Sequence, residues 1–182
     1  MKITETKLAG SFVIEGSRVE DSRGYFVRTW CQREFSEAGL EPHFVQSNQA
    51  YNKFKSTLRG MHMQLAPHAE DKLVCCTRGA LYDVIIDLRT GSPTCGQWFG
   101  IELSMDNLRS LYIPKGFAHG YQTLVDDTTI SYQVSEFYMP GSECGYRWDD
   151  PCFDIRWPAV DERIISDKDL SWPDYVHEAG RL

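Results

Sequence analysis

Short apolar runs rich in β-branched and aromatic residues, separated by Gly, Pro and Asp, dominate the hydrophobic pattern of this chain. Runs of this kind, bounded by turn-forming residues, are typical of β-strands. The pattern predicts turns at 87–93 and 125–127, where Asp, Gly and Pro gather. Strands are predicted at 12–15, 24–30, 72–76, 80–88, 98–103, 110–113, 120–124 and 128–136.

Helical signals are few. One helix is predicted over residues 32–38, ended by Gly39, and a second short one near Asp167. Many short strands with few helices indicate a sandwich or barrel rather than alternating βα units, and we expect a double-sheet jelly roll. No linker-like stretch divides the sequence, so residues 1–182 are predicted to form one domain, with a C-terminal segment (about 159–182) packing on or across the barrel.

Composition narrows the choice of partner. The 182 residues are 42% hydrophobic and 13% aromatic, enough for a sizeable core, and 19 Lys and Arg face 26 Asp and Glu, for a net charge of -7. Nucleic acid is an unsuitable partner because its binding needs a basic surface, whereas a phosphorylated small molecule needs only a few basic side chains gathered locally.

The chain is predicted to be cytoplasmic, with no membrane partner. No stretch reaches the roughly 20 apolar residues that span a bilayer, and the first residues lack the apolar core of a signal peptide. Six cysteines without a Cys-x-x-Cys pair are expected to stay reduced in that compartment. They are Cys31, Cys75, Cys76, Cys95, Cys144 and Cys152.

Two motifs carry candidate chemistry. In Arg59-Gly60-Met61-His62-Met63-Gln64, a strand would place His62 and Gln64 on one face and the two methionines on the other. A His and a nearby Arg suit an anionic ligand, although a single His is more often a core residue bonded to a carbonyl. The run Pro114-Lys115-Gly116-Phe117-Ala118-His119 is similar to the second motif of cupin barrels, whose His is usually a metal ligand.

The residues at two of the metal-ligand positions of the first cupin motif argue against a metal. Metal-binding cupins carry His-x-His and a Glu in their first motif. This sequence has Gln64 in place of the second His, and Lys72 in place of the Glu. Metal sites of this kind are held by imidazole and carboxylate, and an ammonium group repels a cation. We therefore expect a cupin barrel without a metal, with Lys72 supplying the positive charge.

A longer series of motifs runs through the chain in order. Its blocks begin at Asp21, Phe44, Leu58, Lys72, Asp83, Ser92, Pro114, Trp148, Ile155 and Ser166. Through them the chain resembles the dTDP-4-dehydrorhamnose 3,5-epimerase family over nearly its whole length. That resemblance implies an all-β fold, a double-stranded β-helix (jelly roll, cupin-like barrel) with a few short helices. It also implies a homodimer that needs no cofactor and inverts carbons beside the 4-keto group of a nucleotide-sugar.

The resemblance also assigns roles. His62 matches the family's proton acceptor, Asp169 the carboxylate that orients it, and Tyr132 the proton donor. Tyr138 matches the ring that stacks on the nucleobase, and residues 23–28 match a segment that reaches the partner's site. The other substrate-binding positions are Arg23, Phe26, Arg28, Gln46, Asn48, Arg59, His119, Glu143 and Lys168. His43, His68 and His177 have no supporting context and are expected to face solvent.

Such chemistry has clear physical requirements. Removing a proton beside a carbonyl places negative charge on the ketone oxygen, and donors already aimed at that oxygen lower the barrier. Lys72, with His119 or Arg59, is the expected source. A neutral His62 can accept a proton near pH 7 when a carboxylate fixes its tautomer. Inversion then needs a second group on the opposite face, which Tyr132 supplies.

Position 28 departs from the family pattern. The family usually carries Glu there, which accepts the N–H of thymine, whereas Arg28 can only donate. Cytosine therefore remains an alternative base, with thymidine expected. Inversion of carbon 3 alone is another alternative within the enzyme class. Outside it, the candidates are a metal-dependent cupin and a sugar-binding barrel without activity.

Overall fold

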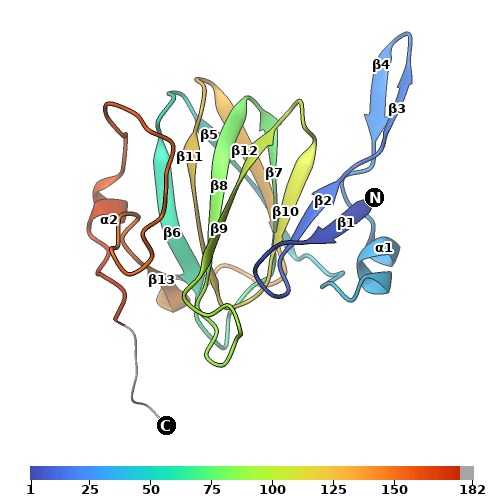
Figure 1. Cartoon of the computed structure of the whole chain (residues 1–182). Coiled ribbons are helices and arrows are strands. Elements are labelled where there is room, and N and C mark those ends of the chain that lie inside the picture. Colours follow the sequence, from blue (N-terminus) through green and yellow to red (C-terminus); the bar gives the residue numbers. More distant parts are fainter. Residues whose placement is uncertain (177–182) are drawn as a thin grey trace.

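The computed structural model describes residues 1–176, which form two facing antiparallel sheets and a separate two-stranded hairpin (Figure 1). The six-stranded sheet contains, in spatial order, β1 (Lys2–Glu5), β2 (Phe12–Glu15), β10 (Arg109–Ile113), β7 (Lys72–Arg78), β12 (Thr128–Val134) and β5 (Gln46–Asn52). The five-stranded sheet contains β13 (Glu143–Gly145), β6 (Leu58–Gln64), β11 (Phe117–Thr123), β8 (Ala80–Asp87) and β9 (Trp98–Ser104).

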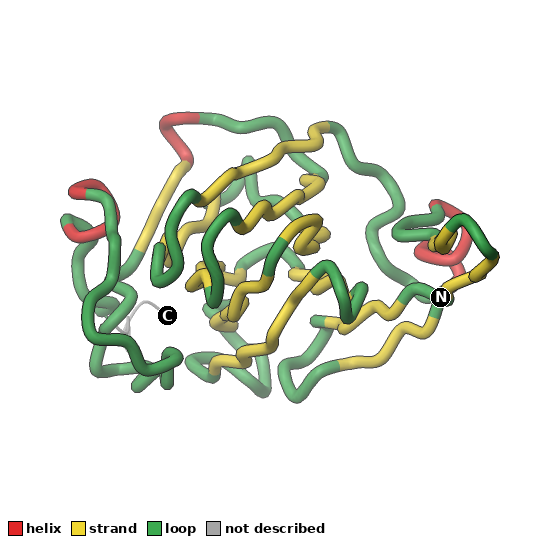
Figure 2. Tube along the Cα trace, turned by 90° about the horizontal axis from the view of Figure 1, so that it is seen from above, coloured by secondary structure: helices red, strands yellow, loops and turns green. Residues whose placement is uncertain are grey.

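The remaining elements lie at the two sides of the sheets. Strands β3 (Arg18–Asp21) and β4 (Gly24–Val27) form a hairpin that extends from the body, and α1 (Gln32–Glu37) follows it. Viewed from above, α1 lies beside the N-terminus, and α2 (Asp167–Leu170) lies at the opposite side (Figure 2). A short 3₁₀ turn, Pro140–Ser142, precedes β13.

Alternating side chains build the core between the sheets. On β8, Leu81 and Ile85 point into this core, where they meet Val74 of β7 and Ile130 of β12. All four side chains are fully buried. The opposite face of β8 carries Val84 and Ile86, which belong to a second apolar cluster. A strand with both faces covered reads as a continuous apolar run, which explains the strong signal at 80–88.

The C-terminal segment provides the cover for that second face. Phe153, Trp157 and Tyr175 pack against the cluster that Met61 and Met63 of β6 share with Val84 and Ile86. The methionines thus face outward from the barrel, as the alternation in the sequence predicts. The predicted 159–182 segment can be followed only to residue 176, since the final six residues lie outside the described part.

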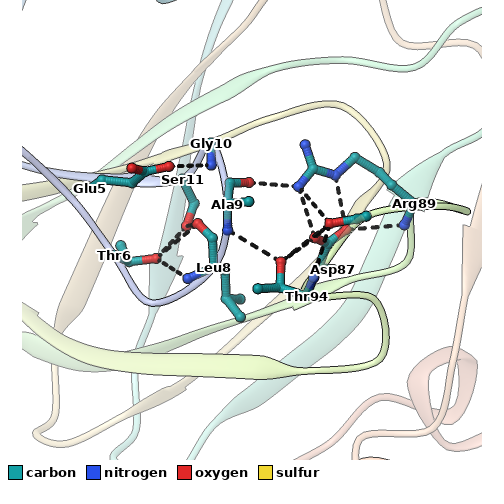
Figure 3. A network of polar contacts seen from close by, with 10 residues as sticks. Glu5, Thr6, Leu8, Ala9, Gly10, Ser11, Asp87, Arg89 and Thr94 are labelled. Carbon is teal, nitrogen blue, oxygen red and sulfur yellow. Dashed lines mark hydrogen bonds and ion pairs between the residues drawn. The ribbon is translucent and has the colours of Figure 1, made fainter.

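A polar network fixes the end of β8 (Figure 3). The Asp87 carboxylate accepts hydrogen bonds from Arg89 (Nε to Oδ1, 2.9 Å) and Thr94 (Oγ1 to Oδ2, 2.7 Å), and another from Ser92. Arg89 also donates to the carbonyl of Ala9 at 2.6 Å. The network joins the turn after β8 to the turn between β1 and β2, so a single buried acid holds segments about 80 residues apart.

The all-β, two-sheet prediction is confirmed, with differences at the strand ends. Residues 24–30 were expected to form one strand, but β4 ends at Val27 because the chain then turns toward α1. Strand β11 begins at Phe117, three residues before the predicted start at 120. The predicted helices at 32–38 and near Asp167 correspond to α1 and α2. The Ser166 hydroxyl caps α2 by accepting from the Asp169 N–H.

Candidate active site

Two adjoining cavities open between the sheets. The larger, about 350 Å³, is bordered by Gln46, Asn48, Tyr138 and Glu143 among others. The smaller, about 260 Å³, is bordered by Arg59, His119 and Tyr121 among others. The side chains of His62, Lys72 and Tyr132 line both cavities. The predicted base, acid and ammonium group therefore meet at one place.

His62 is held by a buried carboxylate. Its Nε2 lies 2.5 Å from Oδ1 of Asp169, whose side chain is 6% exposed. Burial would raise the pKa of the Asp169 carboxyl, but hydrogen bonds from His62 and Ser166 outweigh it and lower that pKa below its usual range. The indole of Trp172 meets the imidazole edge-on, with ring centroids 6.1 Å apart. The His62 imidazole is thus held on two sides by Asp169 and Trp172, which belong to the same short C-terminal segment.

Tyr132 stands on the opposite wall. It belongs to β12 of the six-stranded sheet, whereas His62 belongs to β6 of the five-stranded sheet. Burial and the negative charge of Glu70 raise the pKa of the Tyr132 hydroxyl. The hydroxyl therefore keeps its proton at neutral pH, as a proton donor must.

Lys72 is paired within the cavity wall. Its ammonium lies 3.0 Å from Oε1 of Glu70, and both side chains are largely buried. Gln64 stands at the position where metal-binding cupins have a ligating His. Its carboxamide is hydrogen-bonded to other groups of the protein. Within residues 1–176, no three His, Cys, Asp or Glu side chains are placed to hold a metal ion.

A second imidazole borders the smaller cavity. His119 and His62 are direct cross-strand partners on β11 and β6. Nε2 of His119 lies 2.7 Å from Oδ1 of Asp83, a fully buried carboxylate. Strands β6 and β11 approach closely because both carry Gly near this point. A Cβ on Gly60 would lie only 2.6 Å from the Cα of Gly120.

Two further cationic groups are held by hydrogen bonds. Nε of Arg59 donates to the side-chain oxygen of the buried Asn52 at 2.9 Å. The Lys168 ammonium lies 2.7 Å from both oxygens of Glu143. Glu143 also accepts from the Tyr138 hydroxyl at 3.1 Å. The cavities thus combine positive groups with an exposed aromatic ring, which suits an anionic ligand that carries a flat base.

Three predicted binding residues lie elsewhere in the chain. Arg23 pairs with Asp21 at the tip of the β3–β4 hairpin, and Phe26 on the same hairpin is 67% exposed. Arg28 lies 3.1 Å from Glu34 of α1. None of the three lines either cavity of its own chain.

Some site residues escaped sequence reasoning. Glu70, Asp83, Asn52 and Trp172 each contact a predicted site residue. Only Asp83 carried a signal, because an acid inside a strongly apolar strand needs a partner. Within residues 1–176, neither outlying histidine lines the cavities. His43 is exposed as predicted, His68 is half-buried rather than solvent-facing, and His177 lies outside the described residues.

Comparison with known proteins gives consistent matches. A family model described as dTDP-4-dehydrorhamnose 3,5-epimerase matches residues 5–176. A dTDP-4-dehydrorhamnose 3,5-epimerase of Sinorhizobium fredii is 43% identical over 173 residues, covering 95% of this chain and 86% of the relative.

Two solved structures are similar to this chain over nearly its whole length. The enzyme of that name from Elizabethkingia anophelis superposes with a TM-score of 0.93 at 38% identity, covering 96% of each chain. The Bacillus anthracis enzyme, crystallised with TDP and PPi bound, gives 0.92 at 41% identity, covering 96% of this chain and 99% of that one.

Proposed function

The chain belongs to the dTDP-4-dehydrorhamnose 3,5-epimerase family, and from that premise we propose how its cavities carry out the reaction. The protein is an isomerase of dTDP-rhamnose biosynthesis that acts on a dTDP-linked 4-keto-6-deoxy sugar. The roles of its residues, its subunit arrangement and its location are our proposals.

The observation that carries the mechanism is the placement of His62 and Tyr132 on opposite walls of the shared cavity space. His62, held by Asp169, removes the proton from the carbon beside the ketone. Tyr132 returns a proton from the other face, so the configuration inverts. A barrel that only bound a sugar would need no acid and base on opposed walls, so this arrangement favours catalysis over silent binding.

The cationic wall serves the intermediate. Loss of the proton leaves an enolate, whose negative charge lies on the ketone oxygen. Lys72 and His119 line the smaller cavity next to His62. The Lys72 ammonium can donate to that oxygen, and the second ring nitrogen of His119 can do so when the imidazole is protonated, because the Nε2–H is directed at Asp83. Such donors interact more strongly with the enolate than with the ketone, which lowers the barrier. This polarisation requires no metal, and Lys72 stands where metal-binding cupins have a carboxylate ligand.

The larger cavity is proposed to hold the nucleotide. Tyr138 offers an exposed ring for the base, and Gln46 and Asn48 supply polar groups in the same cavity. Lys168 does not line the cavity but is bonded to Glu143, which does. We place the hairpin residues Arg23, Phe26 and Arg28 at this cavity in a second copy of the chain. Apolar side chains are exposed both on the hairpin and at the cavity rim, and a homodimer would bury them together. They are Val19, Tyr25 and Phe26 on the hairpin, and Leu65, Phe137 and Met139 at the rim.

A cytoplasmic location is also proposed. All six cysteines are free thiols, which fits a reducing compartment. Over residues 1–176, none of the helices has the length and apolar character that a membrane crossing requires.

Replacing His62 by Ala tests the mechanism. In deuterated solvent, wild-type enzyme should exchange the protons beside the ketone, and the variant should lose that exchange while still binding dTDP. The expected fall in rate is about 10²–10⁴-fold, typical of removing an acid–base group. NMR locates the deuterium. Exchange at the wild-type rate in His62→Ala would assign the base to another residue.

A further inference from the structure

Gln64 makes an unusual number of contacts for one buried side chain. It is 4% exposed and lies at the end of β6, on the same face as His62. Its Oε1 accepts from the Met139 N–H at 2.7 Å. Its Nε2 lies 3.1 Å from the His68 carbonyl, 3.1 Å from Glu70 Oε2 and 3.3 Å from the Phe137 carbonyl. Since one side meets a donor and the other only acceptors, the orientation of the carboxamide is fixed.

These contacts hold a segment that has few buried apolar contacts. The side chains of Phe137, Tyr138 and Met139 are all exposed, at 59%, 56% and 40%. A segment with so few buried apolar contacts opens easily unless polar contacts restrain it. Gln64 binds the peptide groups on both sides of Tyr138, and Gln46 of β5 accepts the Tyr138 N–H itself at 2.7 Å.

The two glutamines come from different sheets. Gln46 lies on β5 of the six-stranded sheet, and Gln64 lies on β6 of the five-stranded sheet. The far end of the Tyr138 ring is held by Glu143, which is the cross-strand partner of Gln64. The backbone and the hydroxyl of Tyr138 are therefore both tied to β6 and its neighbour β13.

We propose that Gln64 is a positioning residue for nucleotide binding. Its carboxamide holds the Phe137–Met139 segment so that the Tyr138 ring is already in place at the wall of the larger cavity before the ligand binds. The inference rests on the proposed stacking of Tyr138 on the nucleobase, and it adds what places the ring there. Because its amide is already committed to protein groups, Gln64 acts through Tyr138. A pre-ordered ring spares the ligand the cost of ordering the segment.

The test uses dTDP alone, since this nucleotide carries the base but lacks the 4-keto sugar on which His62 and Lys72 would act. Gln64→Met keeps the unbranched shape but removes the hydrogen bonds. Calorimetry should show the Kd for dTDP raised by about tenfold, because that is the effect of losing one or two such bonds. Tyr138→Ala should also weaken binding. Adding Gln64→Met to Tyr138→Ala should then cost less than about twofold more, because residues acting as one unit are not additive.

Two further variants make the result specific. Gln64→Glu keeps the acceptor for the Met139 N–H but removes the donor and faces Glu70 with a second carboxylate. It should weaken dTDP binding with the same dependence on Tyr138. Gln133→Met is the matched control, because Gln133 neighbours Tyr132 on β12 and so points to the opposite face. Its dTDP affinity should equal that of the wild type.

The outcomes separate the inference from the function it rests on. If Tyr138→Ala weakens binding but the Gln64 variants do not, or if the losses add, Gln64 has no positioning role and the stacking of Tyr138 stands. If Tyr138→Ala leaves dTDP affinity unchanged, the stacking role falls and the inference falls with it. A lower melting temperature with unchanged affinity would make Gln64 a purely structural residue and would also overturn the proposal.

Discussion

At the scale of single residues, two similar imidazoles in the proposed site, His62 and His119, have different surroundings and therefore different proposed roles. His62 and His119 are adjacent imidazoles, each facing a buried carboxylate. They differ in the cavities that they border. His62 lines both cavities, whereas His119 lines only the smaller one. We accordingly propose His62 for proton transfer and His119 for contact with the ketone oxygen.

Tyr132→Phe removes one proton and leaves the ring in place. Stability should change little, because one hydroxyl hydrogen bond contributes about 0.5–1.5 kcal/mol. Product formation should fall by about 10²–10⁴-fold, while deuterium should still enter beside the ketone with the configuration retained, because His62 can return the proton to the face it left. NMR of the recovered sugar distinguishes these events. Normal product formation would assign the acid role to another group.

Asp87 should make stability depend on pH. Burial alone would raise the pKa of its carboxyl, but hydrogen bonds from Arg89, Ser92 and Thr94 prevail and lower it to about 2. A lowered native pKa stabilises the fold above the unfolded value near 4, and this stabilisation is lost as pH falls toward 2. It amounts to about 2 kcal/mol.

Asp87→Asn should therefore be less stable than wild type at pH 6, by about 2 kcal/mol, and the gap should close between pH 4 and pH 2. Denaturant unfolding at several pH values measures it. Asp149→Asn, which alters the partly exposed pair with Arg147, is the control and should change stability by less than about 1 kcal/mol. A gap for Asp87→Asn that stays constant across this range would contradict the assignment.

At the scale of elements, the sequence predicts apolar strands well and polar strands poorly. The run Val84-Ile85-Ile86 identifies β8 because both faces of that strand are buried. Strand β5, Gln-Ser-Asn-Gln-Ala-Tyr-Asn, was missed because it is an edge strand with one face in solvent and the other partly in a cavity. Strand β3 was missed because all four of its residues are exposed. Such strands are set by tertiary pairing, which local pattern does not record.

The hairpin of β3 and β4 offers a test of the subunit arrangement. If it completes the partner's cavity, a His62→Ala chain retains a sound hairpin and a Phe26→Ala chain retains a sound barrel. Mixing the two poorly active variants should then restore up to about a quarter of wild-type activity, since half of random dimers are mixed and each has one complete site. Sedimentation should show a species of twice the chain mass. No recovery on mixing would place the hairpin away from the partner's site.

At the scale of the whole molecule, the two sheets form the two walls of the cavities. The proposed base, His62, comes from one sheet, the proposed acid Tyr132 and the Lys72 ammonium come from the other, and the C-terminal segment places Asp169 beside His62. Alternation along β6 predicted which side chains share a face. It could not predict which residues elsewhere in the chain contact them, so Glu70 beside Gln64 and Trp172 beside His62 emerged only from the fold.

The preference for a nucleobase belongs to this same scale, because in the proposed dimer Arg28 would meet the base across a subunit boundary. Within its own chain, Arg28 is held by Glu34 at 3.1 Å, and Glu34 also binds the N-terminal ammonium. An arginine paired in this way would have to break its ion pair with Glu34 to donate to the ring acceptor of cytosine. We therefore expect the dTDP-linked 4-keto-6-deoxyglucose to be turned over with a kcat/KM at least about tenfold above that of its CDP analogue, since a mispaired buried polar group costs about 1–3 kcal/mol. Arg28→Ala should leave that ratio within about threefold, and Lys2→Ala, which breaks an exposed pair with Glu15, provides the control. A preference for the cytidine sugar that disappears in Arg28→Ala would show that Arg28 leaves Glu34 and reads the base, while the proton chemistry of His62 and Tyr132 would be unaffected.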